Sequence, residues 1–101
     1  MTANGARGEV VAVLARAERR LCLTLGALAE IETALGVEGL DELAERMRRL
    51  AAKDVLAVLA ALLRGGGERA LAETLAEAAV ALPEAADAVA RAFSAAGRTG
   101  R

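Results

Sequence analysis

Histidine, tryptophan and tyrosine are absent from the 101-residue sequence, which also contains a single phenylalanine. Without histidine, the chain lacks the commonest general base and zinc ligand, so Ser-His-Asp and Cys-His arrangements and histidine-containing metal sites are excluded. Carboxylate pairs such as Glu30 and Glu32 remain, but they fall on helix faces that we predict to be solvated. We therefore expect neither catalysis nor a bound metal or cofactor.

No charge of one sign dominates the sequence. The 13 basic and 14 acidic residues give a formal net charge of -1, so electrostatics alone would not attract nucleic acid or anionic lipid. Phe93, the only aromatic residue, cannot supply the series of stacking platforms that single-stranded nucleic acid requires. A small helix-turn-helix regulator is a weaker alternative, and it depends on the arginines of residues 46–49 alone.

Cysteine and long apolar runs are also scarce. Cys22 is the only cysteine, which rules out an intrachain disulfide, and we expect a half-buried thiol compatible with a reducing cytosol. The longest apolar run, residues 55–63, is much shorter than the roughly 20 residues that a membrane-spanning helix needs. Residues 1–10 do not resemble a signal peptide, so we expect a cytoplasmic protein that binds no membrane.

What the sequence does contain is leucine and alanine. Apolar residues make up 55% of the chain, and its length suits one domain with one modest core. Because aromatics are nearly absent, this core must be built from Leu, Val, Ile and Ala in closely packed helices.

The periodicity of residues 9–25 allows two structures. Apolar residues from Val10 to Leu21 fit the spacing of a helix, whereas Leu21, Leu23 and Leu25 alternate as in a strand. The second interpretation is a β-hairpin with strands at residues 9–15 and 19–25 and a turn near residues 16–18. That turn contains none of the glycine that tight hairpin turns favour.

A helix should follow directly. Leu28, Ile31 and Leu35 have helical spacing, Thr24 can cap the first turn, and Gly36 suits a left-handed C-terminal residue. Residues 40–51 form a second amphipathic pattern, with Glu42–Arg46 and Glu45–Arg49 as expected ion pairs four residues apart. Instead of only solvating this helix face, the cations could form a basic docking patch for an acidic partner, made of Arg46, Arg48, Arg49 and Lys53.

The most apolar segment is residues 53–64, whose leucines and valines surround the helix, so we predict a central helix buried on several sides. The three glycines of residues 65–67 should end it; no Gly-Lys-Ser/Thr follows, which argues against a phosphate-binding loop. Residues 68–81 predict another helix, which Pro83 ends or kinks. In residues 84–96 the predicted apolar stripe is Ala86, Val89, Ala90 and Phe93.

The string RLCLTLGALAEIETALG at residues 20–36, with RGEV at 7–10 and DVLAVLAALLRGGG at 54–67, resembles the tail assembly chaperone family of gene transfer agents and related long-tailed phages. The resemblance implies the hairpin, although family members often have Asp-Gly where this chain has Ala17-Glu18. It also implies tape measure and tail tube proteins as partners. The residues that carry it are core and turn positions: Leu21, Leu23, Thr24, Leu25, Gly26, Leu28, Leu35 and Gly36.

The sequence thus predicts an α+β, mostly α fold, with an all-α fold as the alternative. We expect a disordered lead-in at 1–8, one domain at 9–96 divided into a hairpin (9–25) and a helical part (26–96), and a disordered tail at 97–101. The expected function is a non-enzymatic tail assembly chaperone that can also self-associate, or else a structural tail component retained in the particle. The predicted contact residues are Leu62, Leu63, Val89 and Phe93.

Overall fold

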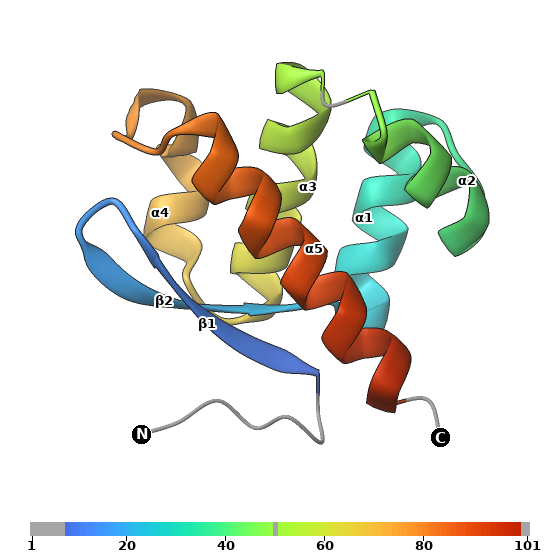
Figure 1. The fold of residues 1–101 in the computed structure, drawn as a ribbon, viewed down its shortest axis with the longest axis horizontal. Coiled ribbons are helices and arrows are strands. Elements are labelled where there is room, and N and C mark those ends of the chain that lie inside the picture. Colours follow the sequence, from blue (N-terminus) through green and yellow to red (C-terminus); the bar gives the residue numbers. More distant parts are fainter. Residues whose placement is uncertain (1–7, 50, 100–101) are drawn as a thin grey trace.

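The computed structural model describes residues 8–49 and 51–99. It contains a two-stranded antiparallel sheet followed by helices, which confirms the α+β, mostly α prediction. The hairpin lies across one end of the helices, and α5 crosses α3 diagonally (Figure 1). The elements are β1 (Glu9–Leu14), β2 (Ala17–Cys22), α1 (Leu25–Leu35), α2 (Gly39–Met47), α3 (Ala52–Gly65), α4 (Arg69–Glu73), the 3₁₀ helix η2 (Leu75–Glu77) and α5 (Leu82–Thr99).

The hairpin turn lies earlier than the sequence predicted. Leu14 pairs with Ala17, so the two turn residues are Ala15 and Arg16, with φ angles of 53° and 70°. Positive φ at both positions matches the twist of the two strands, although neither residue is a glycine. Arg19 supports the turn, because its Nε donates to the carbonyl of Leu14 (3.0 Å) and its Nη2 to that of Ala15 (3.3 Å).

The join between hairpin and helix has the predicted caps. Thr24 Oγ1 accepts a hydrogen bond from the Ala27 amide at 3.0 Å, and Gly36 has φ of 70° at the end of α1. The predicted extension of β2 to residue 25 is wrong, because the strand ends at Cys22 and Leu25 begins α1. Leu25 is therefore 84% exposed instead of sharing a buried face with Leu21.

Helix α2 is shorter than predicted and carries different ion pairs. It ends at Met47, and Leu43 is its buried residue. Arg46 pairs with Asp54 of α3 instead of Glu42, and Glu45 pairs with Arg48 instead of Arg49. Neither expected pair four residues apart forms, because Arg46 contacts Asp54 and the Glu45 carboxylate contacts Arg48.

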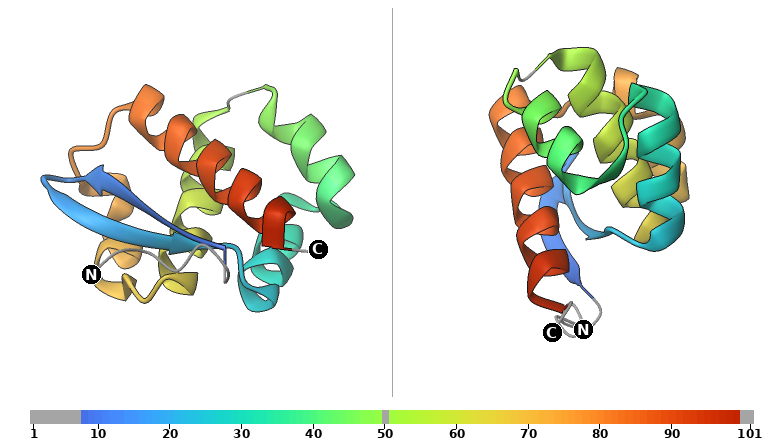
Figure 2. Two further views of the ribbon diagram at one scale, coloured as in Figure 1. Left: turned by 60° about the horizontal axis from the view of Figure 1, so that its bottom comes forward. Right: turned by 90° about the vertical axis from the view of Figure 1, so that its right-hand side faces the viewer.

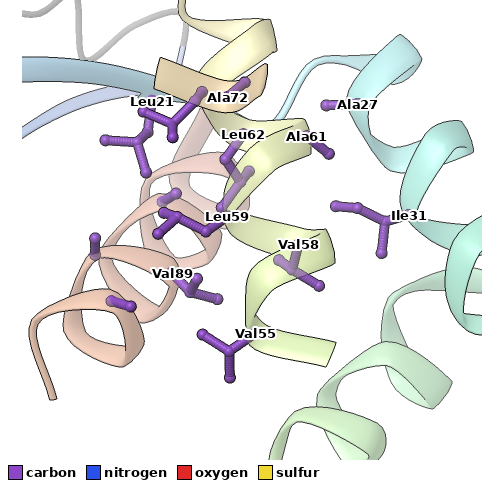
Figure 3. Packing of buried hydrophobic residues seen from close by; sticks show 14 of the residues in the cluster. Leu21, Ala27, Ile31, Val55, Val58, Leu59, Ala61, Leu62, Ala72 and Val89 are labelled. Carbon is purple, nitrogen blue, oxygen red and sulfur yellow. The ribbon is translucent and has the colours of Figure 1, made fainter. Parts of the chain in front are cut away.

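Helix α3 is central, as predicted. One of its faces packs on α1, where Val58 and Ala61 lie opposite Ile31 and Ala27 (Figure 3). Another face packs on α5 and the hairpin through residues that include Leu59 and Leu62. In Figure 2, α5 and α1 lie on opposite sides of α3, which makes a layered arrangement of helices.

The glycines that end α3 allow β2 to approach it closely. A Cβ atom on Gly65 would lie 2.2 Å from the Cys22 carbonyl oxygen, and one on Gly66 would lie 2.1 Å from that of Arg20. Two residues after Gly66, the carboxylate of Glu68 accepts a hydrogen bond from the backbone N–H of Arg20, with an N···Oε2 distance of 3.0 Å. These glycines thus end the helix, as predicted, and also provide the space in which the outer edge of β2 packs.

The single helix predicted for residues 68–81 is divided. Helix α4 ends at Glu73, and η2 then turns Leu75 into the core, where it is 5% exposed. The chain is extended at Ala78 before α5 begins at Leu82. Helix α5 continues to Thr99, beyond the expected domain end at residue 96. Residues 1–7 of the predicted lead-in and residues 100–101 of the predicted tail lie outside the described residues.

Candidate protein-binding surface

Helix α5 attaches to the rest of the molecule mainly through alanine. Its buried residues are Ala85, Ala88, Val89, Ala92 and Ala95. This stripe is rotated from the predicted one: Ala86 and Phe93 are half-buried and Ala90 is exposed. The two largest apolar side chains of α5, Leu82 and Phe93, consequently lie outside this buried stripe: Leu82 is exposed and Phe93 is half-buried.

The first candidate site, which we call the Phe93 groove, lies between α2, α3 and α5. It has a volume of about 250 Å³, and Arg48 is the charged residue of its lining. Its apolar lining comes from all three helices and includes Ala44, Met47, Val55, Ala86, Val89 and Phe93. Because alanines line much of it, helix backbones lie close to the surface, and an apolar side chain from outside can contact several elements at once.

The second site, the Leu56 groove, lies on the other side of the α3–α5 contact and has a volume of about 190 Å³. Helix α3 forms one wall; η2, the connection after it and the first turn of α5 form the other. Two large side chains at this groove, Leu56 and Leu82, are 39% and 46% exposed. Its lining includes Val55, Leu56, Leu59, Leu75, Leu82 and Ala85.

The two grooves meet at Val55, which lines both of them. Val55 is 4% exposed, and it lies beside Val89 in the core (Figure 3). The apolar interior of the molecule is thus reached from two sides at the N-terminal end of α3. Apart from Arg48, the residues that line the two grooves are apolar, which suits them to contacts with apolar side chains.

The four predicted contact residues have different environments. Leu62 and Leu63 are both 0% exposed and belong to the core, so a partner could reach them only if helices separated. Val89 and Phe93 line the Phe93 groove. The sequence pattern did not single out Leu56 or Leu82 as contact residues. The two leucines lie at one groove because the helical path breaks after α4. The helical spacing of residues 68–82 conceals this break.

Two of the four cations of the alternative basic patch, Arg46 and Arg48, are used within the fold. Arg46 donates to Asp54 and, through Nη1, to the carbonyl of Leu35 at 2.7 Å. Arg48 pairs with Glu45 in a hollow that Asp41 also lines. Basic and acidic groups are mixed on α2, which leaves little positive field for a phosphate backbone.

The family motif residues have structural positions. Leu21 is fully buried, Thr24 and Gly36 cap α1, and Leu35 is 7% exposed. Among the described residues, no three His, Cys, Asp or Glu side chains are grouped as metal ligands would be. None of the described helices is both long and apolar enough to cross a membrane.

A family model described as "Phage tail tube protein, GTA-gp10" matches residues 7–98. The match includes the hairpin, both grooves and nearly all of α5. No curated protein and no solved structure matches the chain.

Proposed function

The chain belongs to the family described as phage tail tube protein, GTA-gp10, and from this membership we propose that it is a non-enzymatic tail assembly chaperone of a gene transfer agent. In this role it binds the tape measure protein, and the tail tube protein, in the host cytoplasm while the tail is assembled. A tape measure protein outside the tail exposes apolar helix faces, which associate with other apolar surfaces in water. A chaperone must cover such faces reversibly.

The observation that carries this proposal is the Phe93 groove. It is open, almost entirely apolar and formed by three helices, and grooves of this type bind the apolar face of an amphipathic helix. Val89 and Phe93 form part of its wall, so the client would contact α5 directly. Reversible binding is consistent with its small size and with its alanine-rich lining, which offers little area per residue.

A second candidate function is a structural component of the tail tube that stays in the particle. The family description, which names a tail tube protein, favours it. The two functions differ in stoichiometry, because a tube component is present in many copies in the finished particle and a chaperone is released. Quantitative mass spectrometry of purified particles separates them: a stoichiometric amount of this chain would contradict the chaperone proposal.

Co-expression with the tape measure protein tests the proposal itself. We expect the tape measure protein to be recovered in the soluble fraction and to be retained by the tagged chain. The matched control is co-expression with the same chain carrying Ala90→Glu, which places a carboxylate on the exposed groove side of α5. A tape measure protein that neither binds the unmodified chain nor gains solubility would overturn the proposal.

A further inference from the structure

A single type of charge borders the Phe93 groove. The described residues that α3 and α5 contribute to its lining are all apolar. The α2 side of the lining consists of Ala44, Met47 and Arg48, and the last two follow Ala44 by three and four residues, which places all three on one face. The guanidinium of Arg48 is therefore the charged group that a helix meets when it docks in this groove.

The guanidinium of Arg48 makes one ion pair within the described residues. Its Nη1 donates to the carboxylate of Glu45 at 3.0 Å, and the two side chains are 75% and 74% exposed. A guanidinium carries five N–H groups, so Nε and Nη2 remain available to another acceptor. Arg48 can consequently bind a second carboxylate without releasing Glu45.

The acidic residues near Arg48 do not line the groove. Glu45 and Asp41 line the neighbouring hollow on α2, which Arg48 also borders. On α5, Asp87 pairs with Arg91, and neither residue belongs to the groove lining. Among the described residues that line it, the groove thus has a cation and no anion, and its complement is an apolar surface with a carboxylate beside it.

We propose that the Phe93 groove selects an acidic amphipathic helix, whose apolar stripe fills the groove and whose flanking carboxylate pairs with Arg48. A docked helix excludes water from the groove, which strengthens an ion pair at its edge relative to one in open solvent. The same loss of water penalises a basic helix, because its cation would lie beside the guanidinium. This inference deepens the proposed function and rests on it, since it states the charge of the client segment that the groove accepts.

Two synthetic amphipathic helices test the charge preference without the tape measure protein. Both carry the same leucine stripe and one tryptophan, and the stripe is flanked by glutamate in one peptide and by lysine in the other. The chain contains no tryptophan, so fluorescence titration with the full chain reports the peptide alone. We expect the glutamate peptide to bind about fivefold more tightly at low salt, and the preference to shrink at high salt. Equal affinities, or no binding of either peptide, would overturn the proposal.

A pair of charge reversals assigns the preference to one residue. Arg48→Glu should reverse it, so that the lysine peptide binds more tightly. Arg49→Glu is the matched control, because it makes the same change at an adjacent exposed arginine that does not line the groove, and it should keep the preference for glutamate. Circular dichroism verifies that both variants fold. Equal effects of the two reversals would contradict a role for Arg48 in particular.

The tape measure protein separates this inference from the proposed function. If it binds the unmodified chain and both reversals weaken it equally, the proposed function survives and the selection by Arg48 is rejected. If it does not bind while the glutamate peptide is still preferred, the client assignment is rejected and the charge preference of the groove is retained. Weaker binding by Arg48→Glu than by Arg49→Glu supports both.

Discussion

The guanidinium of Arg46 donates to both carboxylate oxygens of Asp54, with Nε 2.9 Å from Oδ2 and Nη2 3.4 Å from Oδ1. The Asp54 carboxylate is nearly buried and lies in the first turn of α3, while Arg46 also reaches the carbonyl of Leu35 at the end of α1. One side chain thus joins three helices. Because the apolar anchoring of α2 consists mainly of Leu43, this polar connection holds the α2 wall of the Phe93 groove in place.

Asp54→Ala should lower the free energy of unfolding by about 3 kcal/mol, because it leaves a half-buried guanidinium without its carboxylate. Urea denaturation measures the change. The control is Glu45→Ala, which removes the partner of Arg48 in a pair whose side chains are about three-quarters exposed, and which should cost at most about 0.5 kcal/mol. Equal losses in the two variants would show that the Arg46–Asp54 pair contributes no more than a surface pair.

Gly66→Ala should destabilise the fold by about 3 kcal/mol, because the added methyl group would overlap the backbone carbonyl of Arg20 and force β2 away from α3. Gly97→Ala is the matched control, since nothing lies within 4 Å of its Cβ position in α5 and alanine favours a helix. We expect the control to be neutral or to gain up to about 1 kcal/mol. Thermal denaturation of both variants tests the contrast, and a stable Gly66→Ala protein would contradict the close approach.

Arg16→Gly should stabilise the hairpin by up to about 1 kcal/mol, because an L-residue at φ of 70° is strained and glycine is not. Ala17→Gly, one residue further on, lies in the strand and should instead cost about 0.5 kcal/mol. Opposite signs in the two unfolding free energies are the expected result. Stabilisation by Ala17→Gly and not by Arg16→Gly would place the turn where the sequence first suggested.

Ala90→Glu should reduce the affinity for the tape measure protein at least tenfold, about 1.4 kcal/mol, because a carboxylate would be desolvated when an apolar helix docks in the Phe93 groove. Ala90 is exposed, so the fold should be unaffected. Ala29→Glu makes the same change at an exposed position of α1, on the other side of α3. Isothermal titration or quantitative pull-down compares them, and equal binding by both variants would remove the Phe93 groove from the client interface.

Local signals predicted the parts of the fold that depend on neighbouring residues. Thr24 and Gly36 were assigned correctly because capping is a matter of a few adjacent backbone groups. The hairpin was favoured over a helix chiefly through the family resemblance, and its turn was misplaced because Ala15 and Arg16 carry no turn signature. The central position of α3 followed from apolar residues on all its faces.

Contacts between distant elements could not be predicted in this way. Arg46 selects Asp54 over Glu42 only because the C-terminal end of α1 and the first turn of α3 meet beside it. Leu62 and Leu63 looked like surplus apolar surface, yet β2, α1, α4 and α5 pack around α3 and bury both side chains fully. The candidate grooves arise from the same long-range packing. Phe93 was selected from composition, whereas Leu56 became a candidate only once η2 was seen.

Arg91 of α5 donates through Nη2 to the carbonyl of Val11 at 2.5 Å, across a sequence separation of 80 residues. A ribosome adds about 5 to 20 residues per second, so roughly 4 to 16 s pass between the synthesis of β1 and that of the arginine that covers its edge. Throughout that interval the hairpin has no α5 packed on it, and the Val11 carbonyl on β1 lacks its arginine donor. Translation speed, and not only equilibrium stability, therefore sets how long each new copy is exposed to wrong strand partners in the cell.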